Sequence, residues 1–184
     1  MEIENSKKVN ISAIIACRLK SSRLRKKAIL KIGNLSSIEH CIKNTLKIKN
    51  LDNVILATSD NEEDSELESY IYDKSVIFYQ GDSDDVVQRY LSIIEELNID
   101  IFMRITGDMP YVSCEIAEFL LMKHFESGAD YTSAKKFAVG TDIEIINSSA
   151  LKKVKKYFPK ADYSEYMSWY FQNNPKYFNL NFVD

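Results

Sequence analysis

Glycine is scarce in this chain of 184 residues, which contains only five. The two closest, Gly128 and Gly140, are twelve positions apart. The phosphate-binding loops G-x-G-x-x-G and G-x-x-x-x-G-K-[ST] each need glycines within a few residues of one another. Their absence argues against a Rossmann dehydrogenase, a P-loop NTPase and a protein kinase. If the protein binds a nucleotide, side chains must supply the phosphate contacts that glycine-rich backbone loops supply in those proteins.

Metal-binding and redox motifs are also missing. The three cysteines, Cys17, Cys41 and Cys114, are widely spaced and form no C-x-x-C pair, and the two histidines form no H-E-x-x-H motif. These absences exclude the common zinc sites. We expect buried, reduced thiols, which are typical of a cytoplasmic protein.

The sequence lacks a long apolar run and a large net charge. No stretch approaches the roughly eighteen apolar residues of a membrane span, and the residues after Met1 resemble neither a signal peptide nor an anchor. A formal net charge of -3 offers no basic excess for nucleic acid. We expect one cytoplasmic domain over residues 1–184, without membrane insertion and without a nucleic acid partner.

The charges that are present are segregated along the chain. Residues 18–31 contain seven basic and no acidic residues, whereas residues 60–70 contain six acidic and no basic residues. Arginine offers a planar, two-pronged donor that suits phosphate or carboxylate, although codon bias could also produce its distribution here. Five of the 24 basic residues are arginines: Arg18, Arg23, Arg25, Arg89 and Arg104.

Short apolar runs alternate with amphipathic stretches from the start of the chain. The runs predict strands at residues 9–16, 54–57, 76–79, 99–105, 131–133 and 142–146. The amphipathic stretches predict helices at residues 36–49, 62–72, 84–97, 113–127, 148–157 and 163–173. This alternation predicts an α/β fold in which a mainly parallel mixed sheet has helices on both faces.

The loops that follow strands are the informative ones, because ligands bind beyond the carboxyl ends of strands in such folds. The first of these loops holds the sequence R-L-K-S-S-R-L-R-K-K from Arg18 to Lys27. Its cations, with the hydroxyls of Ser21 and Ser22, suit a cradle for a triphosphate. A solvated basic loop and a patch for anionic partners are the alternatives.

Three acidic groups are candidates for metal or substrate binding. Asp108 stands between Gly107 and Pro110 at a strand end, where one carboxylate suits Mg²⁺, although it could simply stabilise its turn. Asp142 and Glu144 lie on one face of a predicted strand and either approach a metal or substrate hydroxyl or face water. In the run from 82 to 85, Asp84 is expected to cap the following helix.

The histidines and the aromatic C-terminal segment are weaker candidates for functional residues. His40 and His124 have no acidic or serine partner at triad-like spacing. We expect the aromatic segment to pack in the core or to form an interface between two copies of the chain, rather than to bind a ligand. Its residues are Tyr163, Tyr166, Trp169, Tyr170 and Phe171.

Several motifs together resemble the cytidylyltransferases that activate acidic sugars, most closely the spore-coat-polysaccharide type. The opening motif A-R-x-x-S-T-R-L-P-x-K stands here as C-R-L-K-S-S-R-L-R-K-K from Cys17 to Lys27. Residues 57–60 match the family's second strand end, and 81–90 match G-x-x-D-D-V-L-x-R-Y. Residues 104–110 match R-I-T-G-D-x-P, and 140–144 match G-L-D-V-E.

The resemblance implies a three-layer α/β/α nucleotide-diphospho-sugar transferase fold of Rossmann-like topology. It also implies a Mg²⁺-dependent transfer of CMP from CTP to a small acidic sugar, with release of pyrophosphate, for surface glycan synthesis. The implied partners are therefore CTP and that acceptor. Other possibilities are another nucleoside triphosphate with a phosphorylated acceptor, or a non-catalytic nucleotide-binding or interaction domain of a glycan-assembly system.

The same resemblance assigns roles by position. Arg18, Lys27 and Asp108 would be catalytic, the first two holding the triphosphate and Asp108 the metal. The metal site would be completed by Asp142, and the acceptor would meet Asp142, Glu144 and Arg89. Further nucleotide contacts would come from Ser21, Ser22, Arg23, Thr58, Asp60, Gly81 and Arg104.

Two features depart from the family pattern. Arg25 and Lys26 replace a Pro-Gly pair, which adds two charges to a loop that normally relies on a rigid turn. Relatives also continue several tens of residues beyond the position of Asp184. We therefore expect a single nucleotidyltransferase domain that lacks the family's C-terminal strand and helix.

Overall fold

The structure is a computed structural model that describes residues 8–20, 24–141, 143–160 and 162–184. Its centre is a mixed sheet with the strand order β5-β4-β1-β6-β8-β7-β9. Strands β5, β4, β1 and β6 are parallel, β8 runs antiparallel to β6 and β7, and β9 is parallel to β7. The strands are β1 Ile11–Ala16, β4 Asn53–Ser59, β5 Val76–Gly81, β6 Ile101–Thr106, β7 Tyr131–Ala134, β8 Glu144–Asn147 and β9 Leu180–Val183.

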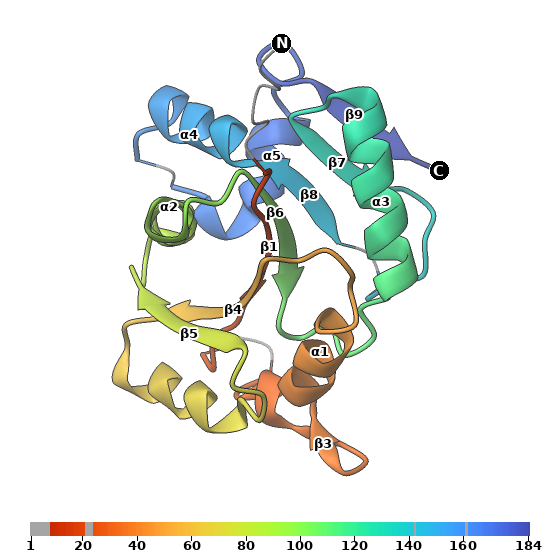
Figure 1. Ribbon diagram of the computed structural model, residues 1–184. Coiled ribbons are helices and arrows are strands. Elements are labelled where there is room, and N and C mark those ends of the chain that lie inside the picture. Colours follow the sequence, from red (N-terminus) through yellow and green to blue (C-terminus); the bar gives the residue numbers. More distant parts are fainter. Residues whose placement is uncertain (1–7, 21–23, 142, 161) are drawn as a thin grey trace, which may run out of the picture.

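Helices cover both faces of the sheet, as predicted (Figure 1). The helices α1 (Ser37–Thr45) and α3 (Cys114–Ser127) pack with η2 (Glu62–Tyr70) on one face. The opposite face carries α2 (Val86–Leu97), α4 (Ser148–Tyr157) and α5 (Met167–Gln172). Successive residues of a strand point to opposite faces, so Ala13 and Ile15 join one core and Ile14 the other. The three-layer α/β/α architecture is confirmed.

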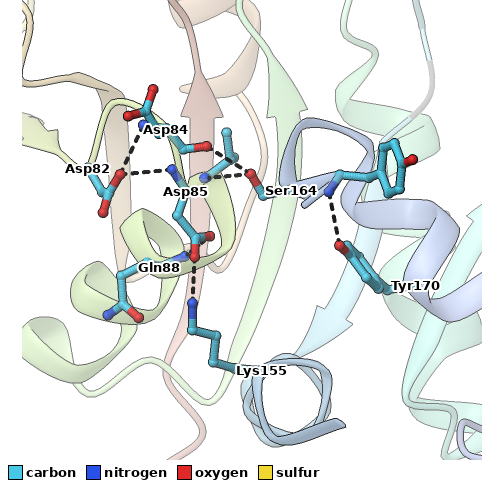
Figure 2. Close-up of polar contacts among 9 residues, drawn as sticks. Asp82, Asp84, Asp85, Gln88, Lys155, Ser164 and Tyr170 are labelled. Carbon is cyan, nitrogen blue, oxygen red and sulfur yellow. Dashed lines mark hydrogen bonds and ion pairs between the residues drawn. The ribbon is translucent and has the colours of Figure 1, made fainter. Parts of the chain in front are cut away.

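Local capping explains where the helices begin. Ser36 and Glu39 form the predicted capping box, although α1 ends at Thr45 rather than near residue 49. The cap of α2 is Asp85, whose side chain accepts a hydrogen bond from Gln88 N at 2.9 Å. The prediction that Asp84 caps this helix is therefore wrong, because the capping side chain is that of the next residue. Asp84 lies in the preceding turn, where the Asp82 carboxylate accepts from the backbone N–H groups of Asp84 and Asp85 (Figure 2).

Two predicted helices differ in form. The segment predicted at 62–72 is the 3-10 helix η2, in which the hydroxyls of Ser65 and Ser69 donate to carbonyls three residues back. Its clustered acids also repel one another, which weakens a regular α-helix. The segment predicted at 163–173 divides into the short 3-10 helix η3 (Ser164–Tyr166) and α5.

Several short elements were not expected from the sequence. The 3-10 turn η1 (Lys27–Ile29) precedes a small hairpin of β2 (Lys31–Ile32) and β3 (Leu35–Ser36). Strand β9 adds to the sheet beside β7 and has only four residues, too few for a clear alternation pattern. Within the described part of the chain, the helices are all too short or too polar to cross a lipid bilayer.

Candidate active site

The carboxyl ends of β1, β4, β5 and β6 meet at one edge of the sheet, because these strands are parallel. The loops leaving that edge carry most of the residues singled out in the sequence. Strand β9 runs in the same direction as β6, so Asp184, directly after it, also lies at this edge. Sequence reasoning missed Asp184 because it missed the strand.

Lys27 and Asp108, 81 positions apart in the sequence, form an ion pair at this edge. Lys27 Nζ lies 2.9 Å from Asp108 Oδ2, and both side chains are about half exposed. Partial burial opposes ionisation of Asp108, but hydrogen bonds from Lys27 and Thr106 outweigh it and hold the pKa of the carboxyl below its ordinary value. Asp108 is therefore an available anion at neutral pH.

Gly107 permits the close approach that makes this pair possible. Its N–H donates to Ala16 O at 2.8 Å, which ties the end of β6 to the end of β1. A Cβ atom at this position would lie 2.7 Å from the Cβ and 2.8 Å from the Sγ of Cys17. The prediction that this glycine allows close backbone approach is confirmed.

The basic loop is anchored by a buried carboxylate. Asp64 in η2 is 2% exposed, and its Oδ1 accepts a hydrogen bond from Leu19 N at 2.7 Å. Its other oxygen accepts from the Ser59 hydroxyl at the end of β4. From the sequence, Asp64 is one member of an acidic run, and nothing in that run distinguishes it from its exposed neighbours.

The two residues that replace the family's Pro-Gly pair close the same loop. Lys26 N donates to Leu19 O at 3.0 Å. Lys26 takes the left-handed conformation, with φ of 55°, that glycine adopts most easily. Arg25 and Lys26 also pair with Glu63 and Glu66 of η2, so the basic and acidic segments of the sequence face each other here.

Arg18 and Arg104 contact the same segment, η3. Arg18 Nη2 forms an ion pair with Glu165 Oε2 at 2.8 Å. Arg104 Nη2 donates to the backbone oxygen of Glu165 at 3.5 Å. Sequence reasoning missed Glu165, whose only signal was an acid within an aromatic stretch.

A largely buried polar cluster lies where β6 meets β8. Arg104 Nη1 is 2.7 Å from Glu144 Oε2, and the Tyr131 hydroxyl donates to the other Glu144 oxygen. Burial and the neighbouring charge of Glu144 raise the pKa of Tyr131, so this hydroxyl keeps its proton. A cavity of about 110 Å³ is bounded by Arg104, Glu144, Thr106, Met109 and Ile143. Arg104 Nε is buried without a hydrogen-bond partner among the described residues.

The other predicted nucleotide residues take varied positions. Thr58 is fully buried, and its hydroxyl has no partner within the described ranges. Asp60 is exposed, and its N–H donates to Gly81 O at 2.9 Å. Gly81 leaves room for Arg89, whose Cγ would lie 2.9 Å from a Cβ there.

Arg89, predicted to bind substrate, supports a loop in this structure. It is 3% exposed, and its Nε and Nη2 both donate to Asp82 O. Burial lowers the pKa of this guanidinium below its ordinary value. Its role toward a substrate stays a prediction.

The structure leaves four predicted site residues undescribed. Ser21, Ser22, Arg23 and Asp142 lie outside the described residues.

Both histidines lie within the described part of the chain. His40 Nε2 contacts Ile32 O at 2.9 Å, and His124 is buried against Thr132 and Asn147.

The thiols and the aromatic segment are placed largely as expected. Cys17 and Cys41 are free and buried, and burial raises the pKa of Cys41 to about 12, whereas Cys114 is partly exposed. In the aromatic segment Phe171 is buried, and Tyr163, Tyr166 and Trp169 are at least half exposed. A second cavity, of about 520 Å³, is bounded in part by Tyr163, Trp169 and Tyr170. An interface between two copies stays a prediction.

The donor set at the sheet edge fits a hydrated Mg²⁺ ion. Among the described residues, no group of three or more His, Cys, Asp or Glu side chains could enclose a metal. Mg²⁺ commonly uses one or two carboxylates and completes its shell with water and phosphate oxygens. Asp108, ionised and half exposed, meets that requirement.

Sequence comparisons give one family match and two relatives. The model of a family described as cytidylyltransferase matches residues 12–182. The chain is 28% identical to the spore coat polysaccharide biosynthesis protein SpsF of Bacillus subtilis (strain 168), over 95% of this chain and 75% of that protein. It is 30% identical to the uncharacterized protein MJ1063 of Methanocaldococcus jannaschii, over 96% of this chain and 72% of that protein.

Solved structures show the same arrangement of elements. A cytidylyltransferase from Leptospira borgpetersenii serovar Hardjo-bovis superposes with a TM-score of 0.88 at 25% identity, covering 96% of this chain and 76% of that one. A CMP:2-keto-3-deoxy-manno-octonic acid synthetase, solved with CTP, superposes with a TM-score of 0.73 at 14% identity, covering 95% and 89%. The second likeness shows the fold alone.

Proposed function

This chain belongs to the cytidylyltransferase family, and we propose that it transfers CMP from CTP to a small acidic sugar with release of pyrophosphate. The Lys27–Asp108 pair is the observation that carries the proposal, because a cation that suits phosphate and an anion that suits a metal are in contact at the edge where the parallel strands end. The relative named for spore coat polysaccharide biosynthesis supports a role in surface glycan synthesis.

The proposed reaction is a single displacement. A hydroxyl oxygen of the acceptor attacks the α-phosphorus of CTP and forms a new phosphorus–oxygen bond. The bond from the α-phosphorus to the oxygen that bridges to the β-phosphate breaks, pyrophosphate leaves with that oxygen, and the hydroxyl proton passes to solvent. Lys27 and Arg18 would bind the triphosphate oxygens and neutralise the charge that accumulates on pyrophosphate. Asp108 would hold Mg²⁺, which, when bound, neutralises charge on the phosphates.

The ion pair suits this reaction because its two charges match both parts of a magnesium–nucleotide complex. Before binding, Lys27 and Asp108 keep each other oriented at the sheet edge. On binding, Lys27 would exchange the carboxylate for phosphate, and Asp108 would be free to hold the metal. Neither charged group is left unpaired, so the exchange costs little.

We propose that the acceptor occupies the edge near Arg104 and Glu144. These two side chains neutralise each other, and both line the cavity of about 110 Å³ at this edge. Charged and polar groups of this kind suit the oxygens of a sugar acid. Asp142 stays the predicted second ligand of the metal.

Pyrophosphate release tests the proposal. Purified protein is incubated with Mg²⁺, each of CTP, UTP, GTP and ATP, and a panel of sugar acids and sugar phosphates. We expect release with CTP and a sugar acid, and its loss in Asp108→Asn. Release only with another nucleotide and a sugar phosphate would favour the alternative reaction, and no release under any condition would contradict transferase activity.

A matched variant controls for nonspecific effects of removing charge. Lys123 forms an exposed ion pair with Glu126 on α3, at 2.7 Å. Lys123→Ala should release pyrophosphate at the wild-type rate, whereas Lys27→Ala should be strongly impaired.

A further inference from the structure

The segment 163–166 connects three parts of the sheet edge. Ser164 is 3% exposed, and its hydroxyl donates to Asp84 O at 3.1 Å and accepts from Val86 N at 3.0 Å. Tyr163 N donates to the Tyr170 hydroxyl at 3.1 Å. Figure 2 shows Ser164 lying against the loop that opens α2. These contacts fix η3 beside the nucleotide loops.

Glu165 extends from this anchored segment to the residues on either side. Its carboxylate pairs with Arg18 at 2.8 Å, and its backbone oxygen accepts from Arg104 at 3.5 Å. The side chains of Arg18 and Glu165 are 45% and 49% exposed, so solvent and ligands reach the pair. Glu165 therefore links the proposed triphosphate residue to the proposed acceptor residue.

We propose that Glu165 is a specificity-determining residue of the triphosphate site, whose carboxylate occupies Arg18 until a polyphosphate displaces it. Carboxylate and phosphate oxygens are equivalent ligands for a guanidinium. A ligand with a single anionic group gains little by replacing Glu165, because it exchanges one such pair for another. A polyphosphate contacts several cations of the loop at once and therefore wins the exchange.

This inference rests on the proposed function only in identifying Arg18 as a phosphate ligand. Its physical consequence is that polyphosphate binding releases the Glu165 carboxylate from Arg18, while the contacts of Ser164 hold η3 in place. The chain's single tryptophan reports on that release. Trp169 is 51% exposed and stacks on Tyr166, next to Glu165, with ring centroids 4.4 Å apart and planes at 15°.

Calorimetric titration with inorganic tripolyphosphate in magnesium-free buffer tests the competition. Exposed ion pairs contribute about 0.2–1 kcal/mol, which corresponds to a change of up to about fivefold in an equilibrium constant. Glu165→Gln should therefore bind tripolyphosphate more tightly than the wild type, by about 1.4-fold to fivefold. Equal or weaker binding by Glu165→Gln, or no binding by either protein, would overturn the inference.

A matched variant separates displacement from a general change of charge. Glu126 on α3 forms a similarly exposed pair with Lys123, at 2.7 Å and outside the basic loop. Glu126→Gln removes the same charge but leaves Arg18 paired and frees no cation of that loop, so its affinity for tripolyphosphate should stay within the wild-type error. An equal gain in Glu126→Gln would mean that net charge alone sets the affinity and would overturn the inference.

Trp169 emission provides a second readout. Saturating tripolyphosphate should change the emission of the wild type, while Glu165→Gln should start near the bound-state emission and change little. Unchanged emission in the wild type at saturation would contradict the displacement of Glu165. Neither measurement requires turnover, so a protein that releases no pyrophosphate with any substrate would refute the proposed reaction and leave this test intact.

Discussion

At the scale of single residues, Gly107 controls how closely the Asp108 loop approaches the basic loop. A side chain at this position would overlap Cys17, at the end of β1. The contact is with a buried side chain beside the sheet, which cannot move away freely. The position of Asp108 opposite Lys27 therefore depends on the absence of one Cβ atom.

Replacing Gly107 with alanine should disturb both stability and the site. We expect Gly107→Ala to lower the free energy of unfolding by about 1–3 kcal/mol, because overpacking forces a shift of the backbone. The same shift should weaken nucleotide binding by moving Asp108. Thermal unfolding and nucleotide titration measure the two effects.

Gly128→Ala is the comparison for this variant. Gly128 ends α3 with φ of +60° and has open space around it, so alanine there should cost about 1 kcal/mol through backbone strain alone. Nucleotide binding should stay at the wild-type level. If Gly107→Ala also binds nucleotide normally, the close approach does not position the site.

Residue positions were predictable where the strand pattern fixes the loop. Lys27 and Asp108 lie in loops predicted to follow strands, and both are found at the same edge of the sheet. Burial was not predictable, because it depends on neighbours distant in sequence. Asp64 and Arg89 have the composition of surface residues and are both at most 3% exposed.

At the scale of elements, η2 acts as the support of the basic loop. It is a 3-10 helix in which the carboxylate of Asp64 is turned inward and buried. That carboxylate, Asp64, satisfies Leu19 N and the Ser59 hydroxyl at the ends of two strands. The conformation of the basic loop thus depends on a carboxylate in an element distant from it in the sequence.

Asp64→Ala should loosen the loop. The buried N–H of Leu19 would lose its acceptor, which costs about 1–3 kcal/mol of stability. We also expect the KM for nucleotide to rise severalfold while kcat changes less, since Lys27 and Asp108 remain. Glu68→Ala, an exposed acid of the same helix, should change neither quantity; an unchanged KM in Asp64→Ala would contradict the anchoring role.

Helix α3 gives the protein a pH dependence through His124. Burial lowers the pKa of His124 below its ordinary value of 6.5. The unfolded chain then binds a proton more readily, so the stabilisation is complete above pH 6.5 and is lost as the pH falls through the lowered, folded-state pKa. Stability should therefore decrease on the acid side of pH 6.5.

His124→Gln should weaken that dependence. The amide keeps polar groups near Thr132 and Asn147 but cannot titrate. Unfolding midpoints measured from pH 7.5 to 5 should fall less steeply in His124→Gln than in the wild type, whereas His40→Gln should follow the wild type. Parallel curves for all three proteins would show that another group is responsible.

Elements were predictable where the periodic pattern is long. The buried strands and the long helices follow directly from it. The capping box at Ser36 adds a local signal that fixes where α1 begins. The two-residue strands of the hairpin and the four-residue β9 carry too little pattern. Their formation depends on neighbouring backbone that becomes available only in the folded chain.

At the scale of the whole molecule, the parallel half of the sheet collects distant residues at one edge. Both faces of that half are buried, which is why β1 reads as a nearly continuous apolar run. Strand order then brings Lys27 and Asp108 into contact at the edge where Arg18 also lies, without a glycine-rich loop. That the nucleotide is held by side chains, as the scarcity of glycine indicates, stays a prediction.

The central claim is that Lys27 and Asp108 form one catalytic unit, and a double-mutant cycle on pyrophosphate release tests it most directly. The proteins are the wild type, Lys27→Ala, Asp108→Asn and the double variant, with the Lys123–Glu126 pair as a parallel control cycle. Each single variant should lose on the order of 10²-fold in kcat. The account predicts that the double variant is hardly slower than either single one. Wild-type rates in the single variants, or losses that simply multiply in the double variant, would contradict it.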